Sequence, residues 1–475
     1  MNGTVQPKFH GREDRHRWLI LANVSLGTFM ATLDGSIANV ALPTIASEVN
    51  QPLHIVQWVL TAYLLTICAT LPIIGKLSDL VGRTKVYNYG FLIFTIGSAG
   101  CGLSHSLGFL IAARVLQAIG ASCLMSNSQA IIAETFREGR GKAMGITGTV
   151  VSVGSLTGPG IGGLLVGSLG WPSIFWINIP IGILAFAAGW FILPKQQSHL
   201  GAKQPFDYWG SVLFVLGMLT FLYTISNAEE WGWVSGQTLG LGIFSILSLT
   251  SFYILERKIS YPMLDFSLYS IRAFAIGNIA ALLSFVSLFC TNVMMPFYMQ
   301  NVLHYTPATT GYAMMAYPLT MAIVAPFSGW LSDKIGPSIL TTGGLVINAL
   351  GFALLNTLSG QVSPWIIGLH LSLFGLGGGM FQSPNNASVM GSVPKAKLGT
   401  AGGLNALIRN MGMVLGIALS VSLYSYQIHE LTGQIGNVTD EASMLSALHL
   451  VFWTAMGVCL IGALISSMRL KQTLQ

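Results

Sequence analysis

Charged residues are scarce in this chain. Only 8% of its 475 residues are Asp, Glu, Lys or Arg, and 52% are hydrophobic, whereas soluble domains carry about 25% charged residues. Three uncharged stretches each have room for two membrane spans of about 20 residues, and they are 143–194, 273–332 and 335–394. Hydrocarbon offers backbone groups no water, so only helices or a closed barrel can cross it, and unbroken apolar runs favour helices. The composition therefore excludes a soluble globular protein and predicts an all-α membrane protein.

The sequence also lacks the signatures of several other classes. No Gly-x-x-x-x-Gly-Lys-[Ser/Thr] phosphate loop is present, so ATP is not expected to drive the protein directly. The five cysteines form no spaced pairs, which predicts buried thiols without disulfides or a metal site, and they are Cys68, Cys101, Cys123, Cys290 and Cys459. Four histidines near span ends lack an adjacent acid or nucleophile pattern, and they are His105, His304, His370 and His449. We therefore expect no enzyme activity, no cofactor and no metal.

The hydrophobic runs divide into fourteen predicted spans. Their ranges are 18–43, 54–75, 85–104, 107–134, 142–168, 172–194, 207–227, 236–256, 272–300, 309–331, 337–358, 363–388, 398–428 and 443–468. Twenty of the 22 Lys and Arg residues fall at the chain ends or in even-numbered connections, and the odd-numbered connections contain none. By the positive-inside rule, the even connections and both termini are cytoplasmic. The net charge of +6 thus reflects topology and does not imply nucleic acid.

A short motif occurs twice along the chain. The pattern G-x-L-S-D-x-x-G begins at Gly75 and again at Gly329, in two connections that are both cytoplasmic. Two copies on one side require an even number of helices between them, which a seven-plus-seven duplication does not provide. We therefore predict two six-helix bundles related as parallel repeats, with two helices inserted between them. The expected segments are a cytoplasmic tail 1–17, a bundle 18–195, the insertion 196–260, a bundle 261–469 and a cytoplasmic tail 470–475.

Two opposite charges fall inside spans at similar depth. Asp34 ends an uncharged run, and counting about 1.5 Å per residue puts it about 24 Å above the cytoplasmic start of its helix. Arg114 lies about 10 Å below the outer face by the same count. The other fifteen acids read as lying in tails, connections or helix ends. Because a lone acid within a span marks an ion or substrate pathway, we hypothesise a proton site formed by Asp34 and Arg114, joined through Gln117 or water. The alternative is a static ion pair that only sets helix register.

A second arginine, Arg409, lies close to mid-membrane, about 16 Å from the start of its span. It could contact an anionic substrate group or brace backbone carbonyls, and bracing is favoured because no acid is near in sequence. Flexible methionines and polar residues in apolar spans are candidate substrate contacts. They could equally fill the core or join helices by hydrogen bonds. The candidates are Asn39, Asn127, Gln129, Asn292, Met295, Met299, Gln382, Asn385 and Arg409.

Five sets of residues form one specific combination of motifs. The first span carries Leu33, Asp34, Asn39, Ala41, Leu42 and Pro43, and the connection after span two carries Gly75, Leu77, Asp79, Gly82 and Arg83. Span four carries Arg114, Gln117, Gly120 and Ala121. Span five carries Gly154, Gly158, Pro159, Gly162 and Gly163, and the stretch before span six carries Phe175, Asn178, Pro180 and Gly182. Together these sets resemble the major facilitator superfamily, specifically its fourteen-helix drug:proton antiporter branch. The chain departs from the family pattern at Ser36, where Thr is usual, at Leu80, where the family often has Arg, and at Ala118, in place of a usual Gly.

The span-five motif is associated in this family with exchangers. Glycines at 154, 158 and 162 share one helix face and let a neighbouring backbone approach, and Pro159 can kink the helix. We expect a close helix contact that prevents proton leak, the alternative being glycines without a special role. The two cytoplasmic motifs should latch the helix ends in one state of the cycle, or else be merely solvated, and their residues are Gly75, Asp79, Gly82, Arg83, Gly329 and Asp333.

The resemblance implies a multidrug-efflux antiporter that exchanges small amphiphilic compounds for protons by alternating access, with a role in antibiotic resistance. The alternative within transport is an exporter of a physiological metabolite, lipid or siderophore, and a membrane-embedded enzyme or a non-transporting receptor are further alternatives. With one acid inside the spans we expect monovalent cationic, neutral or weakly acidic substrates. The implied setting is the bacterial cytoplasmic membrane, with protons, substrate and lipid as partners, no nucleic acid, and a functional monomer.

Overall fold

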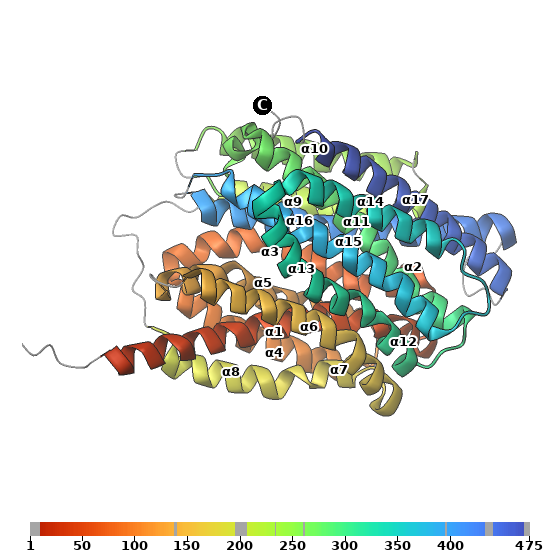
Figure 1. The fold of residues 1–475 in the computed structure, drawn as a ribbon, viewed down its shortest axis with the longest axis horizontal. Coiled ribbons are helices and arrows are strands. Elements are labelled where there is room, and N and C mark those ends of the chain that lie inside the picture. The colour runs from red at the N-terminus through yellow and green to blue at the C-terminus, as the bar shows by residue number, and fades with distance from the viewer. Residues whose placement is uncertain are drawn as a thin grey trace, which may run out of the picture.

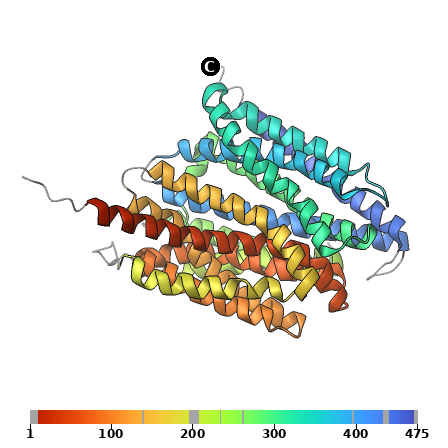
Figure 2. The same cartoon turned by 60° about the horizontal axis from the view of Figure 1, so that its bottom comes forward.

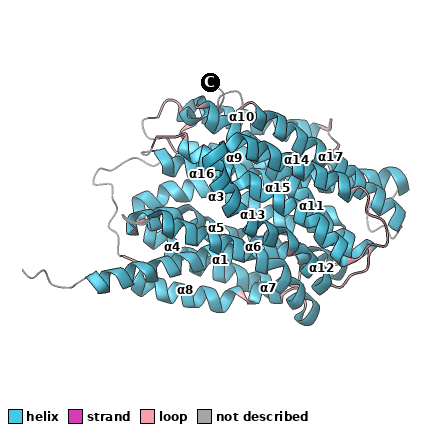
Figure 3. Ribbon diagram, viewed as in Figure 1, coloured by secondary structure: helices cyan, strands magenta, loops and turns pink. Residues whose placement is uncertain are grey.

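The computed structural model describes residues 10–136, 140–194, 207–232, 234–259, 262–394, 397–432 and 440–469. These residues form helices and connecting loops, and none of them lies in a strand (Figure 3). The expected tail 470–475 and the boundaries of the insertion near 195 and 260 lie outside the described residues. Within the described residues, 13 helices are long and apolar enough to cross a membrane. The chain is thus an all-helical membrane protein, as the composition predicts.

The first six predicted spans form an N-terminal bundle. Its helices are α1 (His10–Glu48), α2 (Leu53–Val56), α3 (Trp58–Val81), α4 (Arg83–Gly102), α5 (Leu107–Thr135), α6 (Arg140–Leu169), α7 (Ser173–Trp176) and α8 (Asn178–Ile192). Helix α4 occupies the third predicted span but is not among the 13. Helix α1 begins earlier than the predicted span, so part of the expected tail 1–17 is helical.

The last six predicted spans form a C-terminal bundle. Its helices are η1 (Phe266–Ser270), α11 (Arg272–Phe297), the π-helical turn η2 (Tyr298–Val302), α12 (Pro307–Met314), α13 (Ala316–Ile335), α14 (Pro337–Leu355), α15 (Pro364–Gly391), α16 (Leu398–Thr432) and α17 (Glu441–Ser467). In Figures 1 and 2 the red-to-yellow helices of the N-terminal bundle fill the lower part, and the teal-to-blue helices of the C-terminal bundle fill the upper part.

The two inserted helices, α9 (Tyr208–Trp231) and α10 (Gly236–Glu256), form a hairpin at the side of the molecule. Helix α9 contacts both α3 and α16, so it spans the boundary between the bundles, whereas α10 packs mainly on α9 and lies at the edge in Figure 1. The rings of Trp58 on α3 and Tyr223 on α9 lie 5.3 Å apart. The insertion is therefore placed against one of the two seams between the bundles.

The other seam is built by α6. This helix lies between α1 of its own bundle and α12 and α13 of the C-terminal bundle (Figures 1 and 2). The contact with α12 involves the last turns of α6, which the charge pattern places at the outer end of the membrane. The outer ends of the two bundles are therefore in direct contact in this conformation.

Candidate functional site

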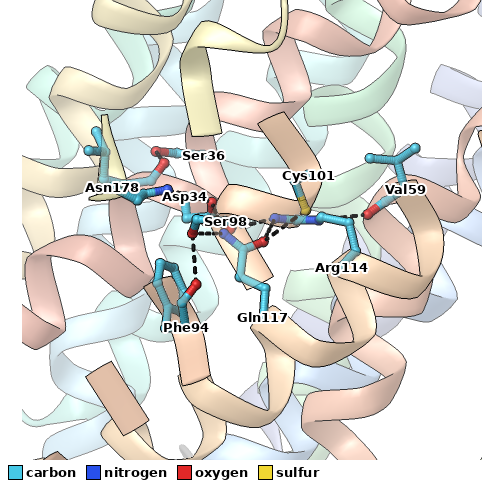
Figure 4. A network of polar contacts seen from close by, with 10 residues as sticks. Asp34, Ser36, Val59, Phe94, Ser98, Cys101, Arg114, Gln117 and Asn178 are labelled. Atoms are coloured by element: carbon cyan, nitrogen blue, oxygen red, sulfur yellow. Dashed lines mark hydrogen bonds and ion pairs between the residues drawn. The ribbon is translucent and has the colours of Figure 1, made fainter. Parts of the chain in front are cut away.

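Asp34 is the centre of a buried hydrogen-bond network in the N-terminal bundle (Figure 4). Its Oδ2 accepts a hydrogen bond from Arg114 Nη1 at 2.5 Å. Its Oδ1 accepts two more, from Gln117 Nε2 at 2.8 Å and from Asn178 Nδ2 at 3.0 Å. All four side chains have 0% exposure. The structure thus brings together the three residues predicted to form one site and adds Asn178.

The Arg114 guanidinium has further partners. Nη1 donates to Gln117 Oε1 at 2.6 Å, and Nε donates to the carbonyl oxygen of Val59 at 3.0 Å. The guanidinium carbon lies 4.1 Å from the centre of the Tyr63 ring and 5.6 Å from that of Phe175. A cation over an aromatic face is stabilised by the ring quadrupole, and more strongly when water is absent. The positive charge is therefore compensated by an acid, two neutral oxygens and two rings.

The network joins five spans of one bundle. Asp34 comes from α1, Arg114 and Gln117 from α5, and Asn178 from the start of α8. Gln117 Nε2 also donates to Ser98 Oγ of α4 at 2.8 Å, and Val59 belongs to α3. Because these groups are far from water, each needs a partner in the protein to offset its desolvation. A change in the charge of Asp34 would therefore act on all five spans at once.

Asn178, Ser98 and Tyr63 belong to this site although the sequence does not predict that they do. In the sequence, Asn178 is only part of the motif before span six. The available signal was its place as a single amide in an apolar stretch, Ser173–Trp176 followed by Asn178–Ile192. Its function could not be read from that signal, because an amide in a span also joins helices without any ligand.

The span-five motif uses two faces of α6. Gly154, Gly158 and Gly162 face α1, where an added Cβ would contact Thr32, Ser36 and Ile37. Ser36 Oγ also donates to the carbonyl oxygen of Gly154 at 3.3 Å. The motif therefore lies directly beside the helix turn that carries Asp34.

The second face of α6 contacts the other bundle. An added Cβ on Gly163 would meet the carbonyl oxygen of Pro307 and would lie 3.1 Å from the Cα atoms of Ala308 and Gly311. Reciprocally, an added Cβ on Gly311 would meet the carbonyl oxygen of Pro159. This contact lies at the seam between the bundles, on the other face of the motif from Gly154, Gly158 and Gly162.

The repeated cytoplasmic motifs share their backbone geometry. Gly82 ends α3 with φ +112° and Gly336 ends α13 with φ +83°, and each N–H donates to a serine carbonyl at 2.9 Å. Asp79 and Asp333 occupy equivalent positions before these glycines. Gly75 faces Ser126 and Gly329 faces Ser383, each on a neighbouring helix of the same bundle. Among the described residues, only the first motif has a chain of ion pairs.

That chain runs from Asp79 through Arg83 to Glu134. Arg83 Nε lies 2.7 Å from Asp79 Oδ1, and Arg83 Nη1 lies 2.5 Å from Glu134 Oε1 at the end of α5. The three side chains are about one-third exposed, so the pairs add little to stability. Glu134 is a partner that the motif alone did not reveal.

Five of the candidate substrate contacts are buried, and they are Asn39, Asn127, Met295, Met299 and Asn385. Met295 and Met299 are fully buried in the hydrophobic core, in line with the core alternative. Asn127 is buried and donates to Cys123 O and Ser126 Oγ on its own helix. Asn385 is buried and donates to the carbonyl oxygen of Gly277 while accepting from Arg469. Asn385 thus joins helices, which was the other alternative.

Arg469, just beyond the end of α17, anchors that group. Its Nη2 donates to Asn385 Oδ1 at 3.0 Å, to Ser466 Oγ at 3.1 Å and to Thr341 Oγ1 at 3.3 Å. Burial lowers the pKa of Arg469 to about 10. This arginine is 4% exposed and packed under the C-terminal bundle.

The remaining candidates differ in accessibility. Asn292, Gln382 and Arg409 are half-buried, and Gln129 on α5 is exposed. Among the described residues, no hydrogen bond from the Arg409 guanidinium is found. Both interpretations of Arg409, bracing of backbone carbonyls and contact with an anionic substrate group, stay predictions.

A contact between the bundles that the sequence did not suggest comes from Gln300 in the π-helical turn. Its Nε2 donates to the carbonyl oxygen of Val40 on α1 at 3.1 Å, and its Oε1 accepts from Thr44 Oγ1 at 3.3 Å. π-Helical turns are rare and are found frequently at functional sites. Gln300 therefore holds α11 against the helix that carries Asp34.

The fold and the buried site define a class of protein, the polytopic helical transporters. The family model described as the Major Facilitator Superfamily matches residues 24–281 and 277–473. The chain belongs to this superfamily, and it is a transporter and not an enzyme. Its relatives are bacterial, and it is a multi-pass membrane protein.

Individual relatives carry different names. The chain is 37% identical over 464 residues to the riboflavin transporter RibZ of Clostridioides difficile, an alignment of 97% of this chain and 99% of the relative. It is 32% identical to the multidrug transporter protein MdtP of Bacillus subtilis, over 85% of this chain and 74% of the relative. It is 30% identical to the tetracenomycin C resistance and export protein of Streptomyces glaucescens, over 85% and 75%.

Proposed function

We propose that this transporter is a proton-coupled antiporter that exports small amphiphilic compounds by alternating access. The observation that carries the proposal is the Asp34 carboxylate, which is 0% exposed and holds an arginine and two amides from α5 and α8. An ionisable group buried within a transporter's spans marks a proton pathway by default. The multidrug transporter and the tetracenomycin C export protein among the relatives support the export of amphiphilic compounds.

Protonation of Asp34 would change the contacts that hold these helices together. Protonation of Asp34 removes the negative charge opposite Arg114 and leaves the cation with Gln117 Oε1 and the Val59 carbonyl oxygen. Arg114 thus keeps these hydrogen bonds whether Asp34 is ionised or protonated, while its attraction to α1 weakens when Asp34 is protonated. Since Asp34 is enclosed here, proton entry requires α1, α5 or α8 to move. This couples the proton to helix movement.

An antiporter must also prevent protons from crossing when no substrate is bound, and the contacts of α6 meet this requirement. Glycines on one face of α6 receive the side chains of Thr32, Ser36 and Ile37 of α1, and Gly163 on the other face lets α6 approach the backbone of α12 directly. Such a contact leaves no room for a chain of water at the outer seam, and so no path for protons when the carrier is empty. Movement of α1 on protonation would be transmitted to α6 through the Ser36–Gly154 contact.

A second candidate function is transport of a flavin-like metabolite. It is favoured by the riboflavin transporter, which matches this chain at 37% identity over nearly its whole length, further than the drug-export relatives. The two candidates share the fold and the proton site and differ only in the compound carried.

The test is substrate-induced proton movement in proteoliposomes that contain a pH-sensitive dye. Wild type, Asp34→Asn and Glu430→Gln are compared with cationic, neutral and anionic amphiphiles and with riboflavin. Glu430→Gln is the matched control, because it removes an exposed acid at the outer end of α16, away from the network. We expect a compound-dependent proton signal in wild type and the control and none in Asp34→Asn. A full signal in Asp34→Asn would refute the coupling, and a signal with riboflavin alone would favour the second candidate.

A further inference from the structure

The charges inside the spans do not balance. Asp34 is neutralised by Arg114 at 2.5 Å, so that pair contributes no net charge to the membrane interior. Arg409 adds one positive charge close to the middle of α16, about 16 Å from its start at Leu398. Among the described residues, its guanidinium has no hydrogen bond or ion pair. A cation at this depth is costly unless something compensates it.

Arg409 belongs to a face of α16 that points into the protein. Residues three and four positions apart lie on one side of a helix, and Gly402, Asn405, Arg409, Gly412 and Gly416 follow this spacing. An added Cβ on Gly412 would lie 2.8 Å from the carbonyl oxygen of Leu282 on α11, so that turn of the face packs against protein. Arg409 lies one turn below and is half-buried.

The same face meets both bundles on its cytoplasmic side. Asn405 Nδ2 donates to Asn386 Oδ1 of α15 at 3.1 Å. One turn further down, a Cβ on Gly402 would lie 3.7 Å from Met390 Cε of α15 and 3.8 Å from Gln129 Oε1 of α5. The side chain of Gln129, which comes from the N-terminal bundle, is exposed. Arg409 is thus followed by amides from α5, α15 and α16 along a boundary between the bundles.

We propose that Arg409 binds an anionic group of the transported compound, with Asn386, Asn405 and Gln129 as neutral hydrogen-bonding groups on its cytoplasmic side. The substrate class is then an amphiphile with one negative charge, such as a sulfonate, carboxylate or phosphate diester on an apolar body. This inference rests on the proposed export of amphiphiles and specifies their charge. It differs from the expectation drawn from the single acid, because that acid is already paired.

The physical reason is the compensation of the guanidinium. A planar guanidinium binds an oxyanion through two parallel hydrogen bonds and is more weakly hydrated than an ammonium group. Hydrogen bonds to charged groups are stronger than those between neutral groups. A substrate anion would neutralise the unbalanced charge, whereas a cationic substrate would add to it. Arg409 therefore selects by charge, and the apolar surroundings select by size and hydrophobicity.

The experiment measures binding of three probes that share one apolar body: 1-pyrenesulfonate, 1-pyrenemethanol and a 1-pyrenemethyl trimethylammonium salt. Energy transfer from the protein's 11 tryptophans to pyrene reports binding to the purified full chain in detergent. We expect wild type to bind the sulfonate most tightly. Arg409→Gln should weaken sulfonate binding about tenfold or more and change the alcohol's Kd less than twofold. Arg409→Lys should keep part of the preference.

Two further variants separate the possible causes. Arg257→Gln removes a cation at the end of α10 and should keep the wild-type preference, which excludes a general charge effect. Glu430→Gln, the exposed-acid control used above, should also keep it. If wild type binds the sulfonate no more tightly than the alcohol, or if Arg409→Gln retains the preference, the proposal is wrong. A folded Arg409→Lys without any preference would overturn it as well.

The same variants distinguish this inference from the proposed function. A sulfonate preference that depends on Arg409 in a protein without proton coupling would overturn the antiport alone. The opposite result is proton coupling that depends on Asp34, in a protein that binds the three probes with equal affinity. It would overturn the anionic site alone.

Discussion

Arg114 Nη1 lies 2.5 Å from Asp34 Oδ2, although 80 residues separate them in the sequence, and both side chains have 0% exposure. A buried ion pair of this kind adds little net stability over well-packed apolar residues, because both charges lose their hydration. Removing one partner has a much larger effect, since the other charge is then left uncompensated. The pair therefore links protonation to the packing of α1 against α5.

Asp34→Asn should destabilise the protein by about 3–5 kcal/mol, because it leaves the Arg114 charge without its acid. The double variant Asp34→Asn/Arg114→Gln removes both charges and should recover most of that loss, yet it should not recover proton coupling. Thermal unfolding can be followed with a thiol-reactive dye, since all five cysteines are buried in the folded state. A double variant no more stable than Asp34→Asn would show that the ion pair does not set the stability of this bundle.

Gly163→Ala should open the outer seam. The new Cβ would meet the carbonyl oxygen of Pro307 and lie 3.1 Å from the Cα of Gly311, so α6 and α12 must separate. We expect slower transport and faster passive proton leak into proteoliposomes in the absence of substrate. Gly240→Ala on α10 is the matched control, because an added Cβ there has no atom within 4 Å. An unchanged leak rate in Gly163→Ala would mean that this contact does not seal the carrier.

Within the first cytoplasmic motif, two glycines should respond differently to the same substitution. Gly82 has φ +112°, a conformation that side chains with a Cβ rarely adopt, so Gly82→Ala should lower the free energy of unfolding by about 1–2 kcal/mol. Gly336→Ala should have a similar effect, because that glycine has φ +83°. Gly75→Ala should be tolerated, since the nearest atom to its added Cβ is Ser126 Cβ at 3.9 Å. The comparison is made by thermal unfolding, and equal losses at Gly75 and Gly82 would contradict it.

The Lys397–Asp265 ion pair should make stability depend on pH at the acidic end. Partial burial alone would raise the pKa of Asp265, but hydrogen bonds from Lys397 and Ser267 outweigh it and lower this pKa below its ordinary value. The folded state then binds this proton more weakly than the unfolded state. The contribution is therefore present above the unfolded pKa and is lost as pH falls through the folded pKa.

Asp265→Asn should remove that contribution, so the stability difference between wild type and variant should shrink as pH falls from 7 toward 4. Unfolding temperatures measured across this range test the sign. The effect should be modest, because both groups are partly exposed. A difference that grows on acidification would contradict the argument.

The positions of hydrophobic runs and charges along the sequence were sufficient to predict the fold. Fourteen spans could be located because about 20 apolar residues cross a bilayer, and the repeated motif placed the inserted pair between two bundles. Side-chain partners were harder to predict. Asn178, Glu134 and Gln300 contact groups 51 to 260 residues away, and such pairs depend on how each helix is rotated about its axis. The two faces of α6 could not be assigned to α1 and α12 for the same reason.

The sequence alone predicted the all-helical membrane fold, and by the positive-inside rule it also predicts which side each connection faces and which charges lie inside the membrane. Each of these follows from the cost of placing charge and unpaired backbone in hydrocarbon, which depends only on the order of residues. Only the tertiary structure decided which inside charges compensate one another. Packing of α1 against α5 places Asp34 on Arg114, whereas the rotation of α16 leaves Arg409 without an acid among the described residues. A buried charge is compensated only by groups in contact with it, and the packing of the helices decides which groups are in contact.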